Sequence, residues 1–289
     1  MPHFTAPDGT RLAFHVRGEG TPLLCLPGGP MRASAYLGDL GGLSDHRQLH
    51  LLDLRGTGAS AIPADPTTYR CDRQVDDVEA WREHLGLDRV DVLSHSASGD
   101  LALLYAARYP HRIRTLTFVT ARARALGIDF TGQQRREAAE LRAAEPWYGQ
   151  GRAAYDAVWS GTVTDEEFEA ALPFFYGRWD GAARAHAASD VEQSNESAAD
   201  AYATDGAFAP APTRAVLAAL DVPVLVLAGE LDGGPRPQVA AEVAKLFPRA
   251  ELAVQPGAAH YPWLDDPRHF VSTVAAFLGQ GIPERTDDA

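Results

Sequence analysis

The sequence predicts an α/β fold with a mainly parallel central sheet, and two observations carry this prediction. First, short apolar runs recur along the chain and are mostly unbroken, which is typical of strands that are covered on both faces. They lie at residues 22–28, 49–55, 90–96, 113–121, 222–229 and 250–257. Second, helical periods separate many of them, for instance at 75–85, 100–109, 237–247 and 267–278. Such strand–helix alternation gives a parallel sheet with right-handed crossovers.

The first twenty residues follow a different pattern. Apolar and polar residues alternate there around Asp8-Gly9, a dipeptide that favours a tight hairpin turn. We therefore expect an antiparallel edge before the parallel part of the sheet.

Residues from about 123 to 215 break the alternation of strands and helices. This segment is rich in Ala, Glu and Arg, is helical in pattern and contains no strand-like run. We interpret it as a helical cap over the carboxyl edge of the sheet. Residues 1–122 and 216–280 would then form the core, and residues 281–289 a disordered tail.

The predicted cap also carries many aromatic residues. Such side chains need either a partner surface or a ligand. The candidates for substrate contact are Trp147, Trp159, Phe174 and Trp179. The alternative is a set of extra surface helices with no binding role.

Composition narrows the classes of function. The chain has 26 Lys and Arg against 39 Asp and Glu, a formal net charge of −13, so nucleic acid and anionic membranes are poor partners. No apolar run is long enough for a membrane span, and the N-terminus lacks a signal pattern. The two cysteines, Cys25 and Cys71, are interpreted as reduced thiols. We expect a cytoplasmic enzyme that acts on a small molecule.

The stretch Val92-Leu93-Ser94-His95-Ser96-Ala97-Ser98-Gly99 resembles the nucleophile turn G-x-S-x-G, also called a nucleophile elbow, with serine in place of both flanking glycines. Ser96 lies where the strand gives way to a helix, so it is the candidate nucleophile. Ser94 and Ser98 occupy the flanking positions, which must be small. We expect both to be buried, hydrogen-bonded and turned away from the substrate. The alternative is an ordinary serine-rich strand end.

A serine nucleophile needs a base, and the base needs an acid that holds its tautomer. Asp232 follows one predicted strand and His260 follows the next. Both therefore belong to the same edge of the sheet as Ser96, in the chain order Ser, Asp, His. Glu230 competes with Asp232 for the acid role, but it is closer to its strand and is expected to support the loop.

An oxyanion hole needs two backbone N–H groups. Ala97, in the first turn after the nucleophile, is one candidate donor. Gly29, in the loop Pro27-Gly28-Gly29-Pro30, is the other. An ordinary Gly-Pro turn would explain the same loop.

The chain resembles the α/β-hydrolase superfamily and, within it, the proline iminopeptidase-related enzymes. The likeness is carried by "LPGGP" (26–30), "DLRGTGAS" (53–60) and "SHSASGDLALLYAARYP" (94–110). Pro27 and Met31 replace the histidine and the last glycine of the family's His-Gly-Gly-Pro-Gly motif. The resemblance implies an α/β-hydrolase fold with a cap.

The aminopeptidases of this family use cap glutamates to hold the substrate's amine. The resemblance therefore suggests Glu192 and Glu196 as substrate-binding residues. The alternative is an acidic helix face that only meets solvent.

The predicted function is hydrolysis of an ester or amide of a small, moderately apolar substrate through an acyl-enzyme. Lactone opening and carbon–carbon bond hydrolysis use the same residues and stay open. No metal cluster, phosphate loop or dinucleotide motif is present in the sequence, so no cofactor is expected. A non-catalytic binding protein on the same fold is the alternative from another class, and only the altered elbow glycines favour it.

Overall fold

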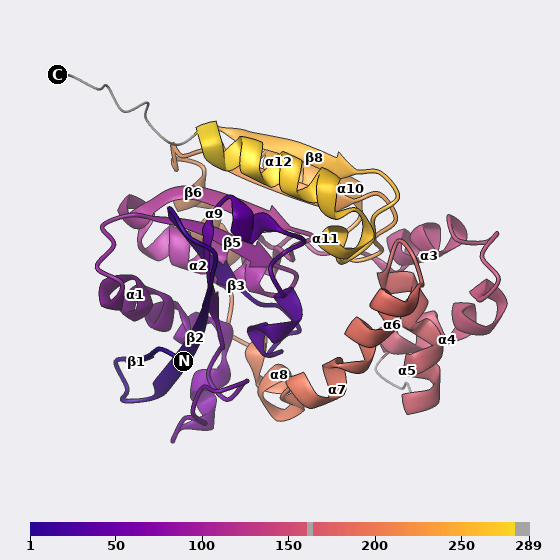
Figure 1. Ribbon diagram of the computed structural model, residues 1–289, viewed down its shortest axis with the longest axis horizontal. Coiled ribbons are helices and arrows are strands. Elements are labelled where there is room, and N and C mark those ends of the chain that lie inside the picture. Colours follow the sequence, from indigo (N-terminus) through magenta and orange to yellow (C-terminus); the bar gives the residue numbers. More distant parts are fainter. Residues whose placement is uncertain (161–163, 281–289) are drawn as a thin grey trace.

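The computed structural model describes residues 1–160 and 164–280, which contain an eight-stranded sheet (Figure 1). Neighbouring strands follow the order β1-β2-β4-β3-β5-β6-β7-β8. The strands are β1 (His3–Thr5), β2 (Arg11–Arg17), β3 (Pro22–Leu26), β4 (Gln48–Leu52), β5 (Val90–His95), β6 (Ile113–Val119), β7 (Val224–Gly229) and β8 (Ala250–Gln255). The tail that was expected to be disordered, 281–289, lies outside the described residues.

The sheet is antiparallel at its N-terminal edge and parallel elsewhere. β1 pairs with β2 and β2 with β4 in antiparallel fashion, whereas all pairs from β4 to β8 are parallel. Between β1 and β2, Gly9 adopts φ +87°, and the N–H of Thr10 donates to Asp8 Oδ1 at 2.9 Å. A turn with positive φ favours glycine because that residue lacks a Cβ. The predicted hairpin and mixed sheet are both confirmed.

Burial explains most of the unbroken apolar runs. Every residue of β5 and of β7 is buried, because both strands lie inside the sheet and helices cover both faces. The prediction that 250–257 is a buried strand is wrong in one respect. β8 is an edge strand, and its Leu252 and Val254 are exposed. An apolar run indicates a strand but not its place in the sheet.

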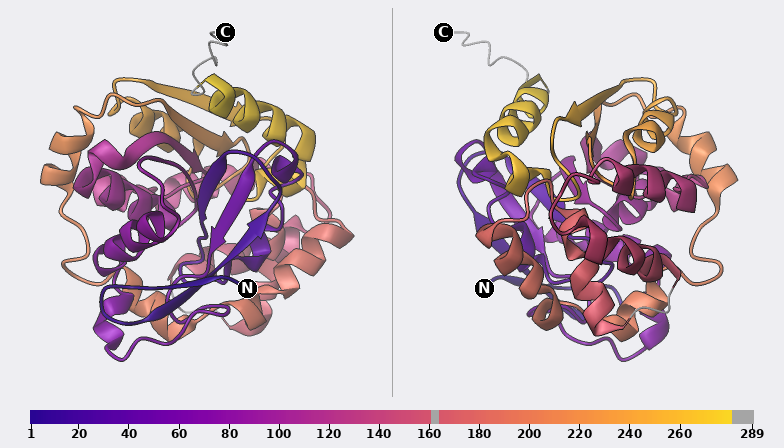
Figure 2. Two further views of the ribbon diagram at one scale, coloured as in Figure 1. Left: turned by 60° about the vertical axis from the view of Figure 1, so that its left-hand side comes forward. Right: turned by 90° about the vertical axis from the view of Figure 1, so that its right-hand side faces the viewer.

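The helices form two layers on the sheet and a separate group beside it (Figures 1 and 2). The α-helices are α1 (Val75–His84), α2 (Ser98–Arg108), α3 (Gly132–Glu140), α4 (Tyr148–Ser160), α5 (Asp165–Ala171), α6 (Gly181–Ala188), α7 (Asp190–Gln193), α8 (Glu196–Tyr202), α9 (Pro210–Leu217), α10 (Pro237–Ala244), α11 (Pro262–Asp265) and α12 (Pro267–Gln280). Short 3₁₀ helices are η1 (Ser34–Leu37), η2 (Leu43–Asp45), η3 (Pro66–Tyr69), η4 (Cys71–Arg73), η5 (Pro110–Arg112), η6 (Arg124–Leu126) and η7 (Leu172–Phe175). No helix of the described chain is long and apolar enough to cross a bilayer.

Each face of the sheet has its own hydrophobic core. One core joins the sheet to α1, α2, α9 and α10, and Trp81 of α1 is fully buried in it. The other joins the opposite face to η1, η2, α11 and α12, with Trp263 and Phe270 at its centre. Helices on both faces are what a buried parallel sheet requires.

The helical insertion lies between β6 and β7 and has small hydrophobic clusters of its own. One cluster packs α4 against α5 and η7 around Tyr155 and Phe174. A second gathers Tyr176 with Ala183 and Ala187 of α6. Figure 1 shows α3 to α6 grouped at the end of the sheet where α11 lies. The expected helical insertion is therefore present, with no strand in its described part.

Candidate active site

Ser96 occupies a strained turn between β5 and α2. Its φ of +54° is in the left-handed region, which costs a non-glycine residue free energy. The turn is fixed by backbone hydrogen bonds: the N–H of Ser96 donates to Val119 O at 3.1 Å, and Ser96 O accepts from the N–H of Arg122 at 2.9 Å. The backbone therefore holds the Ser96 hydroxyl at the carboxyl end of β5, where it lines a pocket.

Two glycines give this turn the space it needs. A Cβ on Gly28 would lie 2.7 Å from Ser96 Cβ, and a Cβ on Gly99 would lie 2.3 Å from Arg122 O. Gly99 does not have a positive φ. The close approach of neighbouring backbone, rather than backbone flexibility, therefore requires glycine at position 99.

The two elbow serines have different surroundings, although both are buried. Ser98 Oγ donates a hydrogen bond to the carbonyl oxygen of Pro27, which confirms the expected packing against a backbone carbonyl. Ser94 Oγ is buried without a hydrogen-bond partner among the described residues, so the expected hydrogen bond of Ser94 is wrong. Neither side chain lines the pocket.

The structure brings the three predicted triad residues together in one chain of hydrogen bonds. His260 Nε2 lies 2.9 Å from Ser96 Oγ, and His260 Nδ1 lies 2.9 Å from Asp232 Oδ2. Asp232 is buried, and its other carboxylate oxygen accepts from the N–H of Gly234 at 2.8 Å. A carboxylate at Nδ1 keeps the ring proton there, which leaves Nε2 free to accept the serine proton.

Glu230 lies in a different environment from Asp232. It is exposed, and its Oε2 accepts from the N–H of Gly257 at 2.8 Å. This hydrogen bond links the loop after β7 to the turn after β8, which is the supporting role expected for Glu230.

Both predicted oxyanion donors lie beside the serine. Gly29 and Ala97 line the same pocket as Ser96. Their N–H groups donate to no other group in the described parts of the chain. Both amides are thus available to a ligand oxygen.

Met31, where the resembled motif has glycine, adopts φ +60° and is fully buried. A methionine in this conformation is strained, and surrounding contacts stabilise it. Met31 O accepts from the N–H of Asn195 at 3.0 Å. The strained residue therefore forms part of the connection between the loop after β3 and the insertion.

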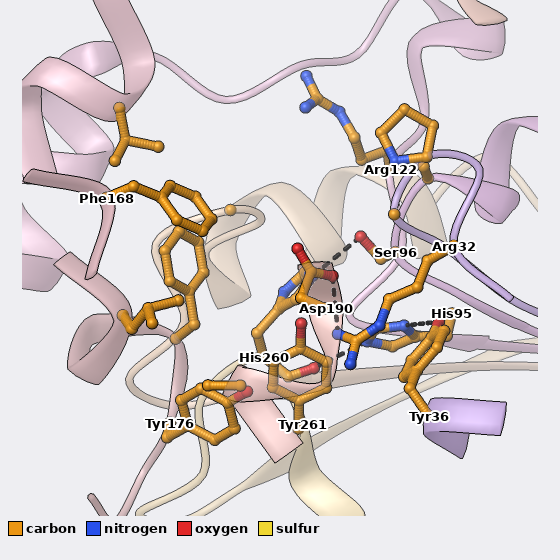
Figure 3. Close-up of a pocket in the computed structure, with 18 residues that line it drawn as sticks. Arg32, Tyr36, His95, Ser96, Arg122, Phe168, Tyr176, Asp190, His260 and Tyr261 are labelled. Atoms are coloured by element: carbon orange, nitrogen blue, oxygen red, sulfur yellow. Dashed lines mark hydrogen bonds and ion pairs between the residues drawn. The ribbon is translucent and has the colours of Figure 1, made fainter. Parts of the chain in front are cut away.

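The pocket above Ser96 has a volume of about 290 Å³ and is lined mainly by apolar side chains (Figure 3). The insertion contributes Val158, Phe168, Leu172, Phe175 and Tyr176. Figure 3 shows Phe168 facing Ser96 and Arg122 across this space. A pocket of this size holds a small substrate and excludes much of the water around it.

An ion pair that sequence reasoning missed also lines the pocket. Arg32 Nη1 lies 3.1 Å from Asp190 Oδ1, beside the triad (Figure 3). The remaining guanidinium nitrogens donate to Gln193 Oε1, Ser189 Oγ and His186 O. Arg32 is buried. Its contacts join the loop after β3 to α6 and α7. Its place two residues after Pro30 of the Gly-Gly-Pro loop was the only signal in the sequence.

The insertion is also bound to the loop of the predicted base. Phe175 O accepts from the N–H of His260 at 3.1 Å. Asp265 accepts from the N–H groups of Ala259 and Gly177, each at 2.8 Å, and burial raises the pKa of Asp265 to about 6. The insertion and the His260 loop are thus held together as one wall of the pocket.

Most of the predicted substrate-binding residues lie elsewhere. Glu192 and Glu196 are exposed and do not line the pocket, whereas Asp190 does. The aromatic candidates Trp147 and Phe174 pack inside the insertion. Trp179 contacts Tyr176 but does not line the pocket. The side chain of Trp159 lies outside the described residues.

Comparison with known proteins places the chain in a family. The model of the alpha/beta hydrolase fold family matches residues 21–267, and the chain belongs to this family. A proline iminopeptidase from Heyndrickxia coagulans is 25% identical over 283 residues, covering 92% of this chain and 93% of that protein.

Solved structures of two enzymes share the fold along almost the whole chain. The proline iminopeptidase of Mycobacterium smegmatis is 26% identical with a TM-score of 0.73, covering 97% of this chain and 98% of that one. A thermophilic esterase from Thermogutta terrifontis is 24% identical with a TM-score of 0.69 and the same coverage. The homologues are of esterase and peptidase type, and the chain is a hydrolase of this fold.

The different contacts of Asp232 and Glu230 lead to a prediction for the acid. Asp232→Asn should keep His260 in place but favour the wrong ring tautomer, lowering kcat by up to about 10⁴-fold. Glu230→Gln should lower kcat by less than about threefold, because the Glu230 carboxylate is exposed and, among the described residues, accepts a hydrogen bond from the Gly257 backbone alone. Steady-state kinetics at matched melting temperatures measure both effects. Equal losses of kcat in the two variants would contradict the assignment of Asp232.

The elbow serines make a matched pair for stability measurements. Ser98→Ala leaves the buried Pro27 carbonyl without its donor and should lower the free energy of unfolding by about 1–3 kcal/mol. Ser94→Ala removes a buried hydroxyl that has no partner in the described part of the chain, and it should be neutral or stabilising. Urea unfolding of the two variants and the natural protein measures the difference. A larger loss for Ser94→Ala than for Ser98→Ala would show that these hydroxyl contacts are misassigned.

Proposed function

We propose that this protein is a serine hydrolase that cleaves esters or amides of small, moderately apolar acids through an acyl-enzyme. The observation that carries the proposal is the hydrogen-bonded chain from Ser96 through His260 to Asp232. Ser96 and His260 line a mainly apolar pocket. A nucleophile, a base and an orienting acid within hydrogen-bonding distance are what acyl transfer requires.

The proposed reaction has two halves. His260 Nε2 takes the Ser96 proton while Ser96 Oγ attacks the substrate carbonyl carbon. The N–H groups of Gly29 and Ala97 bind the resulting oxyanion. His260 then returns the proton to the leaving alcohol or amine as the bond to it breaks. In the second half, His260 takes a proton from a water molecule while the water oxygen attacks the acyl carbon. His260 then returns that proton to Ser96 Oγ as the bond between Ser96 Oγ and the acyl carbon breaks, which releases the acid and restores Ser96.

The charges in the pocket favour an uncharged acyl group. Of the residues that the structure describes, three charged side chains line the pocket beside His260, and each has a partner of opposite charge. Arg32 pairs with Asp190, and Arg122 Nη2 lies 3.0 Å from both carboxylate oxygens of Asp129. A substrate ammonium would find one carboxylate, already neutralised by a buried guanidinium. We therefore propose that acyl groups without an amine react faster than aminoacyl groups.

Aminopeptidase activity is the second candidate, and the similarity to proline iminopeptidases along the full chain favours it. In that function Asp190, rather than Glu192 or Glu196, would receive the substrate's amine, because Asp190 alone of these three lines the pocket.

A pair of nearly isosteric substrates separates the two candidates. L-Proline p-nitroanilide and cyclopentanecarboxylic acid p-nitroanilide have the same leaving group and five-membered ring, and differ in the ring ammonium. We expect the uncharged anilide to have the higher kcat/KM. A clear preference for the proline anilide would instead support the aminopeptidase and overturn the proposed acyl preference.

The nucleophile is tested with a p-nitrophenyl ester of the same cyclopentane acid and a fluorophosphonate probe. Ser96→Ala should lower kcat/KM for the ester by about 10⁴ to 10⁶-fold and abolish covalent labelling, at an unchanged melting temperature. Ser94→Ala serves as the control, since Ser94 does not line the pocket. An active, labelled Ser96→Ala protein would contradict the proposed nucleophile. A natural protein with no activity and no labelling would support a non-catalytic binding role.

A further inference from the structure

Tyr36 and His95, two buried side chains beside the triad, are not used in the proposed reaction. Tyr36 belongs to η1, and His95 is the last residue of β5, directly before Ser96. Both are almost fully buried, yet the structure joins them by a hydrogen bond of 2.7 Å between Tyr36 Oη and His95 Nδ1 (Figure 3).

The protons in this pair can be placed without ambiguity. The N–H of Gly28 donates to Tyr36 Oη at 2.6 Å, so the Tyr36 hydroxyl proton is free to donate to His95 Nδ1. His95 Nε2 lies 2.9 Å from the carbonyl oxygen of His260, which can only accept. Nε2 must therefore carry the ring proton. Burial lowers the pKa of His95 well below its usual value, which keeps the ring neutral in this tautomer.

One end of this relay holds the loop that carries the proposed oxyanion donor. The Gly28 N–H is fixed by Tyr36, and the Pro27 carbonyl accepts from Ser98 Oγ. The Gly28 carbonyl accepts from the N–H of Arg32 at 3.1 Å. In a trans peptide the next N–H points opposite to the carbonyl. These contacts therefore set the direction of the Gly29 N–H, which lies at the pocket.

The other end of the relay holds the backbone of the proposed base. The His260 carbonyl accepts from His95 Nε2 and from Thr120 Oγ1, each at 2.9 Å. The His260 N–H donates to Phe175 O on the insertion. Among the described residues, His95 is thus one of two donors to the carbonyl of the residue whose ring must reach both Ser96 and Asp232.

We propose that Tyr36 and His95 are positioning residues. They form a hydrogen-bonded relay that holds the loop of Gly29 and the backbone of His260 in fixed positions around Ser96. The inference rests on the proposed acyl-enzyme function. Neither side chain exchanges a proton with the substrate. Alignment of the base and the oxyanion donor matters most in the transition state, so loss of the relay should lower kcat and change KM little.

Tyr36→Phe tests the loop end of the relay. It keeps the buried ring but leaves the Gly28 N–H without an acceptor and His95 Nδ1 without a donor. We expect kcat for the cyclopentane ester to fall about 10 to 100-fold, which is less than loss of a whole oxyanion donor, while KM changes less than about threefold. Tyr105→Phe is the matched control: Tyr105 is equally buried, but its hydroxyl donates to Glu79 on α1. This control should keep the natural kcat.

His95→Gln tests the other end and remains available if Tyr36→Phe does not fold. The glutamine amide can still donate to the His260 carbonyl but offers no group at the Nδ1 position, so kcat should fall about 10-fold. The double variant should be no slower than the slower single variant, because both changes break one chain of hydrogen bonds. Effects that multiply, or single variants that lower the melting temperature while keeping kcat, would overturn the relay.

A spectroscopic measurement separates failure of the relay from failure of the proposed function. The proton NMR resonance of the His260 Nδ1–H, hydrogen-bonded to Asp232, can be followed without substrate. Tyr36→Phe and His95→Gln should shift or broaden it, and Tyr105→Phe should not. If the natural protein neither hydrolyses the ester nor reacts with fluorophosphonate, the proposed function is wrong and this resonance alone decides the relay. An unchanged resonance in both relay variants would then overturn it.

Discussion

The left-handed backbone at Ser96 is the constraint on which the site depends. With φ at +54°, the chain reverses within one residue from β5 into α2, and the hydroxyl is left at the end of the strand. Two other segments must then pass very close to this turn. A Cβ at position 28 or 99 would lie within 3 Å of neighbouring atoms, so both positions require glycine. The Gly28 contact brings the candidate oxyanion loop beside the nucleophile. The local strain and the assembly of the site therefore have the same structural origin.

The insertion is part of the same assembly rather than a separate lid. Arg32, from the loop beside Ser96, is surrounded by groups of α6 and α7. The backbone of Phe175 and the carboxylate of Asp265 connect the insertion to the His260 loop. A buried charge costs free energy unless it is paired and hydrogen-bonded; Arg32 has Asp190 as its ion-pair partner and donates to three oxygens of the insertion. These contacts place apolar side chains of the insertion directly above the nucleophile.

Sequence reasoning predicted the sheet and the hairpin, because the periodicity of apolar residues is a local property of the chain. It also predicted the arrangement of Ser96, Asp232 and His260, because the order of strands and loops along the chain indicates which strand ends share an edge. It did not find Arg32, Tyr36 or His95, whose partners are far away along the chain. Nor could composition determine which cap aromatics face the pocket. Phe174 packs inside the insertion while its neighbour Phe175 lines the pocket, a difference set by tertiary packing that their adjacent positions do not reveal.

The altered elbow is compatible with an intact turn for a physical reason. Neither Ser94 nor Ser98 has a positive φ, so glycine is not required at either position for its backbone conformation. What these positions require is small size, and a buried serine meets it at both. Glycine is retained at 28 and 99, where a Cβ would collide. At Ser98 the added hydroxyl donates to Pro27 and so attaches the start of α2 to the loop that carries Gly29. Replacement of the two elbow glycines is therefore not evidence for loss of catalysis, and one of the replacements adds a contact to the loop of the proposed oxyanion hole.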